Sequence, residues 1–120
     1  MPSERQTRRS AAALRDILHH IALAFDLVEG FDEARFASDL RTHYAVIRCL
    51  EIISEASRRL PDELKARHPS IAWRNIAAAG NVYRHEYEDV LPQLVWDTVH
   101  GALAPLRAAA LAEMREDQQQ

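Results

Sequence analysis

Apolar residues recur every three or four positions along most of the chain, which is the spacing of one face of an α-helix. In the first such stretch the apolar positions are Leu14, Ile17, Leu18, Ile21, Phe25 and Val28. They predict a helix from about residue 10 to residue 28, followed by Gly30 as the helix-ending glycine. The residues before this helix are polar, and residues 1–9 are expected to be flexible.

A second apolar stripe predicts a long helix that begins after Asp32, a favourable N-cap residue, and ends near Arg59. This helix is expected to bend near Ser38. Its apolar positions are Phe36, Leu40, Ile47, Leu50 and Ile53. The charged residues on its other side are expected to face solvent and to pair at helical spacing. They are Arg41, Arg48, Glu51, Glu55, Arg58 and Arg59.

Two further helices follow a connector of residues 60–69, in which Pro61 and Pro69 interrupt helical structure. One helix is expected from about residue 70 to residue 85. The last begins near Asp89 and is kinked by Pro105. Its buried side is expected to carry Val90, Leu94, Val95, Val99 and Leu103. The terminal residues 116–120 are expected to be flexible.

Four principal helices joined by short links predict an all-α fold, an up-down bundle of four to five helices. The 120 residues form a single domain, 1–120, that is large enough to bury a core. Apolar residues make up 48% of the chain, and only three glycines and five prolines are present, too few for the many turns of an all-β fold.

Composition also bears on the compartment and the partners. The single cysteine, Cys49, lies in an apolar helical stretch, which favours a buried free thiol in a reducing compartment. The sequence shows neither an apolar run of the ~18 to 20 residues that span a membrane nor a secretory signal. We therefore expect a cytoplasmic protein that does not insert into membranes. The net charge of −3 argues against general coating of nucleic acid, so any RNA contact has to be focused.

Residues 71–87, IAWRNIAAAGNVYRHEY, concentrate the groups that can carry chemistry. On a helix with about 100° per residue, one face of this segment carries Arg74, Ala78, Asn81 and His85. Residues 77–80 have little side-chain volume, which predicts a tight helix crossing, either within the chain or between two chains. Gly80 costs about 1 kcal/mol relative to alanine inside a helix. Its presence therefore needs a reason, such as close packing or a kink.

The end of this segment, residues 84–87, places a proton-transfer group beside a cation. His85 titrates near neutral pH and can act as a general acid or base, while Arg84 can stabilise phosphate charge. These groups suit phosphodiester cleavage. The alternative is a structural helix end, in which His85 interacts with the last carbonyls and Tyr87 packs on the next helix. The other histidines lack the spacing of metal ligands, and no phosphate-binding loop or serine nucleophile elbow occurs.

Four stretches of the chain together resemble one family: RDILHHIALAF, AVIRCLEIISEAS, HPSIAWRNIAAAGNVYRHEYEDV and VWDTVHGALAPL. They resemble the HepT-like branch of the HEPN superfamily, small all-helical toxins encoded beside minimal nucleotidyltransferase antitoxins. The family hallmark is an arginine, four residues that usually start with asparagine or aspartate, a histidine, one further residue and a tyrosine. Asn81, His85 and Tyr87 match this hallmark, and Gly80 stands at the arginine's position. Arg84 is expected to supply the missing guanidinium.

The resemblance implies a toxin of a type VII-like toxin-antitoxin pair. It implies a homodimer in which two motif helices line one cleft, where RNA is cleaved without a metal or another cofactor. His85 and Arg84 are the implied catalytic residues, and Asn81 and Arg74 the implied supporting residues. A minimal nucleotidyltransferase antitoxin is implied to silence the toxin by adding AMP to Tyr87.

Two other functions stay open. One is a catalytically inactive helical binding module that docks a minimal nucleotidyltransferase, and Gly80 at the motif arginine's position favours it. The other is nucleotide binding in the cleft without cleavage.

Overall fold

The computed structural model describes residues 3–85 and 90–119, without the side chains of residues 84, 85 and 117–119. Every regular element of this part is a helix, which confirms the predicted all-α class. In chain order the helices are α1 (Glu4–Val28), α2 (Glu33–Ser38), α3 (Leu40–Arg58), α4 (Asp62–Ala66), α5 (Trp73–His85), α6 (Pro92–Gly101) and α7 (Leu103–Gln119).

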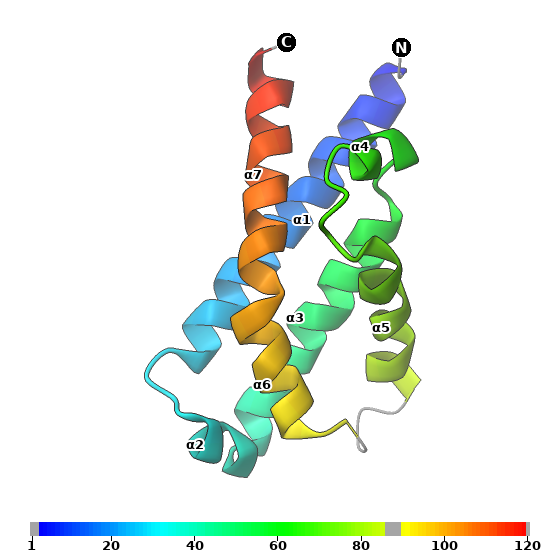
Figure 1. Cartoon of the computed structure of the whole chain (residues 1–120). Coiled ribbons are helices and arrows are strands. Elements are labelled where there is room, and N and C mark those ends of the chain that lie inside the picture. The colour runs from blue at the N-terminus through cyan, green and yellow to red at the C-terminus, as the bar shows by residue number, and fades with distance from the viewer. Residues whose placement is uncertain (1–2, 86–89, 120) are drawn as a thin grey trace.

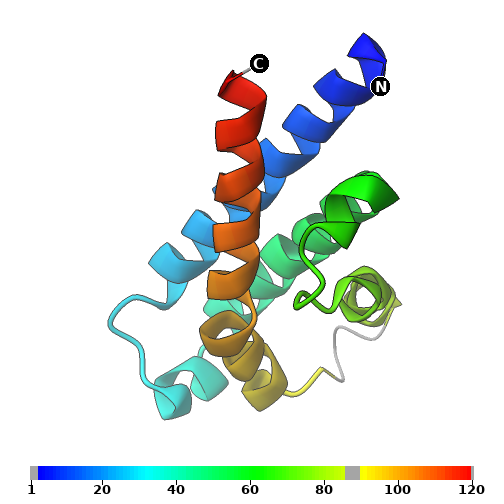
Figure 2. The same ribbon diagram turned by 45° about the horizontal axis from the view of Figure 1, so that its top comes forward.

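Helix α3 is the centre of the bundle. It packs between α1 and α5, while α6 and α7 form one interrupted helix that lies along α3 and α1 (Figures 1 and 2). The short helix α2 packs at one end, against α6 and α3. The four principal helices therefore alternate in direction, as the short links predicted. None of the helices in the described part is long and apolar enough to cross a membrane.

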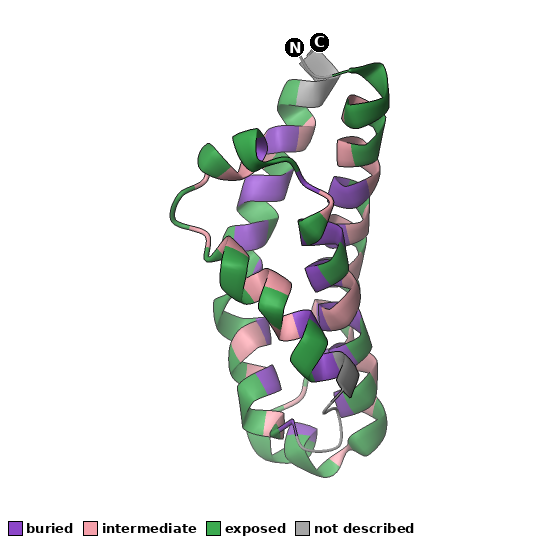
Figure 3. Cartoon of the chain, turned by 90° about the vertical axis from the view of Figure 1, so that its right-hand side faces the viewer, coloured by how far each residue is buried: buried purple, intermediate pink, exposed green. Residues whose placement is uncertain are grey.

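The core lies between α1, α3 and the α6–α7 pair, and the outer faces of the helices are exposed (Figure 3). Cys49 is a buried free thiol, as predicted, and burial raises its pKa.

Leu40 and Leu94 are exposed, although the apolar pattern predicted that both would be buried. Both stand in the first turn of their helices, where the neighbouring helices no longer cover the side chain. The largest fully buried apolar side chains are Phe36, Ile17, Ile21, Leu106, Val46, Val95 and Val99.

Helix α1 begins at Glu4, not near residue 10 as the apolar pattern suggested. Ser3 and Gln6 explain the earlier start, because they form a capping box that satisfies orphan backbone N–H groups. The Ser3 hydroxyl accepts from the Gln6 backbone N–H at 3.1 Å, and the Gln6 side chain accepts from the Ser3 backbone N–H at 2.8 Å. The helix ends at Val28 as predicted, and Gly30 just beyond it has a positive φ of 78°.

The bend expected near Ser38 is a complete break at Asp39, which separates α2 from α3. Asp39 leaves the helical conformation, and its carboxylate accepts a hydrogen bond from the Thr42 backbone N–H at 3.1 Å, so it serves as the N-cap of α3. Asp32 caps α2 in the same way, as predicted, by accepting from the Arg35 N–H at 2.8 Å.

The predicted kink at Pro105 is confirmed as the break between α6 and α7 at Ala102. Proline has no N–H to bond the carbonyl four residues before it, so the helix loses a hydrogen bond at Gly101. Helix α7 then continues to Gln119, through residues that we expected to be flexible.

Candidate functional site on helix α5

Helix α5 begins at Trp73 rather than near residue 70, and its described part runs to His85. Of the residues expected on one face, Arg74, Ala78 and Asn81 are all exposed, so this face of the helix is open to a partner. His85 is the last described residue of the helix. The side chains of Arg84 and His85, and the whole of Tyr87, lie outside the described residues, so their predicted roles stay predictions.

The opposite face of α5 makes a close crossing with α3 at Gly80. Gly80 is buried, and a Cβ built on it would lie 2.8 Å from the Cβ of Ser54 and closer still to the Ser54 hydroxyl. The Ser54 Oγ accepts from the Gly80 N–H at 3.1 Å and donates to the Ala77 carbonyl at 3.1 Å. The crossing that residues 77–80 predicted therefore occurs at Gly80 within the chain, and close packing is the reason for this glycine.

Arg58, one turn beyond Ser54 on α3, joins the same crossing. Its Nε and Nη2 donate to the Ala77 carbonyl at 3.2 and 2.6 Å. This carbonyl thus accepts from Ser54 and from Arg58, and both side chains tie α5 to α3. Sequence reasoning treated Arg58 only as part of a solvated charged face. Its spacing of four from Ser54 indicates one shared face, but does not reveal which helix that face meets.

An open pocket of about 370 Å³ runs along the outer face of α3 and is lined by Arg48, Glu51, Ile52, Glu55 and Arg59. Its charges are mixed and partly paired. Arg48 bonds Glu51 at 2.8 Å, and Arg59, which we expected near Glu51 or Glu55, reaches across to Asp16 of α1 at 2.7 Å. In the described part of the chain, no group of three or more His, Cys, Asp or Glu side chains is placed to hold a metal ion.

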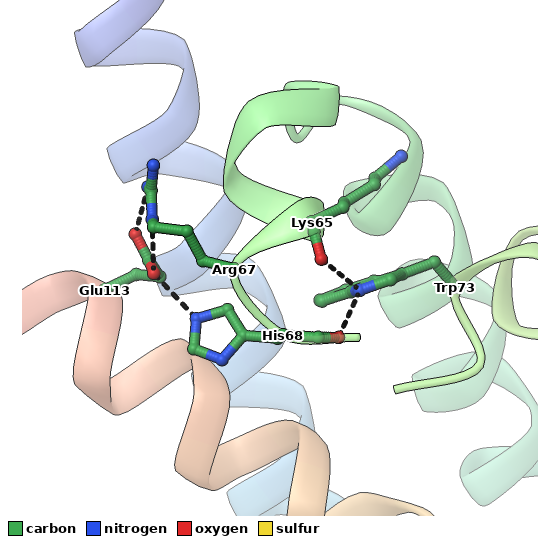
Figure 4. Close-up of polar contacts among 5 residues, drawn as sticks. All are labelled: Lys65, Arg67, His68, Trp73 and Glu113. Carbon is green, nitrogen blue, oxygen red and sulfur yellow. Dashed lines mark hydrogen bonds and ion pairs between the residues drawn. The ribbon is translucent and has the colours of Figure 1, made fainter. Parts of the chain in front are cut away.

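A charged cluster anchors the connector that leads into α5 (Figure 4). Glu113 of α7 is buried and accepts two hydrogen bonds from Arg67, at 2.6 and 3.2 Å, and one from His68 Nε2 at 2.7 Å. The Arg67 hydrogen bond, with help from His68, lowers the pKa of Glu113. The Trp73 indole N–H donates to the carbonyls of Lys65 and His68, both at 3.1 Å. These bonds set where α5 starts.

Two buried titratable groups, Tyr83 of α5 and His43 of α3, have shifted pKa values. Tyr83 packs in the core, and burial raises the pKa of its hydroxyl, which the Thr98 side chain of α6 partly offsets. His43 of α3 is buried against the ring of Phe36, and its Nδ1 has no hydrogen-bond partner. Burial lowers the pKa of His43, an effect that the backbone of Val90 partly offsets. A neutral imidazole follows, because a buried charge without a partner is costly.

Comparisons with known proteins identify the family. The model of the family described as "Ribonuclease HepT-like" matches residues 17–112. A Thermococcus cleftensis protein named "Probable ribonuclease HepT" is 38% identical over 97 residues, covering 78% of this chain and 88% of that protein. A "Putative RNase" of Methanocaldococcus jannaschii is 32% identical over 87 residues, covering 72% of this chain and 75% of that protein. No solved structure matches significantly. The extent of these matches shows that the chain belongs to the HepT-like ribonuclease family.

Proposed function

We propose that the chain is a HepT-like toxin, a metal-independent endoribonuclease that acts as a homodimer. One observation carries this proposal: the exposed stripe of Arg74, Ala78 and Asn81 on α5 leads to His85 at the helix end, in a chain whose relatives are named as ribonucleases. Single-stranded RNA is the preferred substrate, because its backbone and bases are accessible to side chains.

His85 serves as the proton-transfer group of the reaction. It accepts the proton of a ribose 2′-hydroxyl while the 2′-oxygen attacks the neighbouring phosphorus. The bond from phosphorus to the 5′-oxygen then breaks, and that oxygen takes up a proton as it leaves. Arg84, next to His85 in the chain, binds the phosphate and stabilises its developing negative charge. Asn81 and Arg74 line the approach along the exposed face of α5.

The exposed face of α5 supports the proposed dimer. Between Arg74 and Asn81 it presents the small Ala78, and one turn later it presents Val82, whose side chain is 43% exposed. A small residue followed by an uncovered apolar residue suits the close approach of a second α5. A twofold arrangement, the default for a homo-oligomer, brings two copies of His85 to one groove.

The proposed regulation is that of a type VII-like toxin-antitoxin pair. A minimal nucleotidyltransferase transfers AMP from ATP to the hydroxyl of Tyr87, with release of pyrophosphate. Tyr87 stands two residues after the end of α5. An adenylate at this position would set a phosphate and a bulky adenosine beside His85 and so keep RNA out.

A specific observation also favours the second candidate, an inactive module that docks the nucleotidyltransferase. Gly80 stands at the motif arginine's position, and its crossing with Ser54 leaves no room for a larger residue without a shift of α3 or α5. Replacing Gly80 with arginine therefore cannot simply restore the motif. If the protein is an active ribonuclease, another arginine has to supply the guanidinium.

RNA cleavage in the presence of a metal chelator tests the proposal. At concentrations where the protein is a dimer, wild type should cleave single-stranded RNA. His85→Ala should reduce the rate by about a hundredfold or more, the usual contribution of a general acid or base. His19→Ala, which removes an exposed histidine of α1, is the matched control. Intact RNA with wild type would refute the ribonuclease and favour the docking module.

A further inference from the structure

We propose that Arg58 of α3 binds an RNA phosphate beside α5 and so adds a second guanidinium to that of Arg84, where position 80 lacks one. The inference rests on the proposed ribonuclease function and names a substrate contact of that site. It follows from how Arg58 is held, from its charge environment and from the Gly80 crossing.

The guanidinium of Arg58 is held in place on α5. Two of its nitrogens, Nε and Nη2, donate to the Ala77 carbonyl, and the Ser54 hydroxyl shares that carbonyl. Arg58 is nevertheless exposed, and Nε and Nη2 do not use all the N–H groups of the guanidinium. A long side chain normally loses conformational entropy when it binds a ligand. Because the Ala77 carbonyl already orders Arg58, an anion can bind at lower entropic cost.

Arg58 also forms no ion pair with the described residues. Three other arginines of this chain bond a carboxylate: Arg48 bonds Glu51, Arg59 bonds Asp16, and Arg67 bonds Glu113. In the part of the chain that the structure describes, Arg58 has no carboxylate partner, and its recorded acceptor is a neutral carbonyl. An ordered, exposed guanidinium without such a partner suits a phosphate, which it can bind with parallel hydrogen bonds.

The crossing at Gly80 places this cation at the level of the missing motif arginine. The Ser54 hydroxyl bonds both the Ala77 carbonyl, which holds Arg58, and the Gly80 N–H. Arg58 therefore reaches the same turn of α5 on which residue 80 stands, from the neighbouring helix. The lack of a side chain at Gly80 is what lets α3 come close enough for this contact.

Salt-dependent binding of a non-cleavable RNA tests the inference. The probe is a single-stranded oligouridine with 2′-O-methyl groups, which removes the attacking hydroxyl and so separates binding from cleavage. For single strands, the slope of log affinity against log salt changes by about 0.7 for each phosphate contact. Arg58→Gln should lower the slope by about that amount and weaken binding on the order of tenfold at low salt. Cleavage of unmodified RNA should fall as well.

Three controls separate phosphate binding from a purely structural role. The Arg58→Gln side chain keeps an N–H donor for the Ala77 carbonyl, so its melting temperature should stay close to wild type. Arg58→Lys keeps the charge and should retain the wild-type salt slope. Arg107→Gln removes another exposed arginine, on α7, and should change neither binding nor slope.

The outcomes are distinct. A wild type that cleaves RNA, with an unchanged salt slope in Arg58→Gln, overturns the role of Arg58 and leaves the proposed function standing. A wild type that neither binds nor cleaves RNA overturns both. If Arg58→Gln does not fold, Arg58→Met decides, because it keeps the aliphatic stem and loses the charge, and an unchanged salt slope in that variant contradicts the inference.

Discussion

Ser54 and Gly80 fit together because one has a small hydroxyl and the other has no side chain. The Ser54 Oγ accepts from the Gly80 backbone N–H at 3.1 Å, while a Cβ at position 80 would lie 2.8 Å from the Cβ of Ser54. The contact joins α3 to α5 and sets the distance between them. Glycine inside a helix costs about 1 kcal/mol relative to alanine. Close packing against Ser54 explains why Gly80 is nevertheless present in α5.

We predict that Gly80→Ala destabilises the protein by about 1–3 kcal/mol, the usual cost of overpacking, although alanine is the better helix former. The matched control is Gly101→Ala, because a Cβ at Gly101 meets nothing within 4 Å and should be tolerated. Urea denaturation measures both. Ser54→Gly should rescue Gly80→Ala in a double-mutant cycle, and equal effects of Gly80→Ala with and without Ser54 would contradict the packing account.

Glu113 should make stability sensitive to acid. Its lowered pKa in the folded state means that the carboxylate stabilises the fold above the ordinary glutamate pKa, and that this contribution is lost as pH falls through the lowered pKa. Glu113→Gln should lower the free energy of unfolding by about 1–3 kcal/mol near pH 7, because Arg67 and His68 then bond a neutral amide instead of a carboxylate.

The pH profile distinguishes this effect from a loss of packing. The difference in unfolding free energy between wild type and Glu113→Gln should shrink as the pH is lowered from about 7 to about 3. Asp97→Asn, an exposed change on α6, is the control and should leave the profile unchanged. A difference that stays constant across this range would show that the charge of Glu113 is not what stabilises the connector.

Local sequence patterns predicted most of the helices but not the contacts between them. Val28 ends its helix as expected, and Pro105 interrupts the last one, because glycine, proline and apolar spacing act within a few residues. The extension of α1 to Glu4 was missed, although Ser3 and Gln6 have the capping-box spacing that could have revealed it.

The site illustrates the limit of that reasoning. Gly80 signalled a close crossing, but its partner Ser54 is 26 positions away, and no periodicity connects them. Glu113 and His68 are 45 positions apart, so nothing local marks either as half of a hydrogen-bonded pair. In the sequence, Arg58 looked like one more residue of a charged, solvent-facing helix side. Only the packing of α3 on α5 shows that it bonds the Ala77 carbonyl of α5.

Ala78 tests the proposed dimer. It is exposed in the single chain, so a larger side chain there does not overpack the core. We predict that Ala78→Leu or Ala78→Glu shifts the protein toward monomer in light scattering, with its helical circular dichroism retained. Ala108→Glu, an equally exposed change on α7, should leave the oligomeric state unchanged. A wild type that is already monomeric at high micromolar concentration would rule the dimer out.

Tyr87 separates regulation from catalysis. It follows His85 by two residues, and the proposed silencing attaches AMP to its hydroxyl. We predict that Tyr87→Phe, which keeps the ring and loses only the nucleophilic oxygen, folds and dimerises like wild type. It should cleave RNA as well as wild type, because the proton transfer belongs to His85.

With the co-encoded nucleotidyltransferase, ATP and magnesium, wild type should gain the mass of one AMP per modified chain in intact-mass spectra, and its ribonuclease activity should fall in parallel. Tyr87→Phe should gain no mass and stay active. Tyr83→Phe is the matched control: Tyr83 is buried, so its hydroxyl is out of reach and the variant should still be modified. If Tyr87→Phe gains the same mass as wild type, the acceptor is another residue, and if wild type gains none, AMP transfer is not how this partner silences the protein.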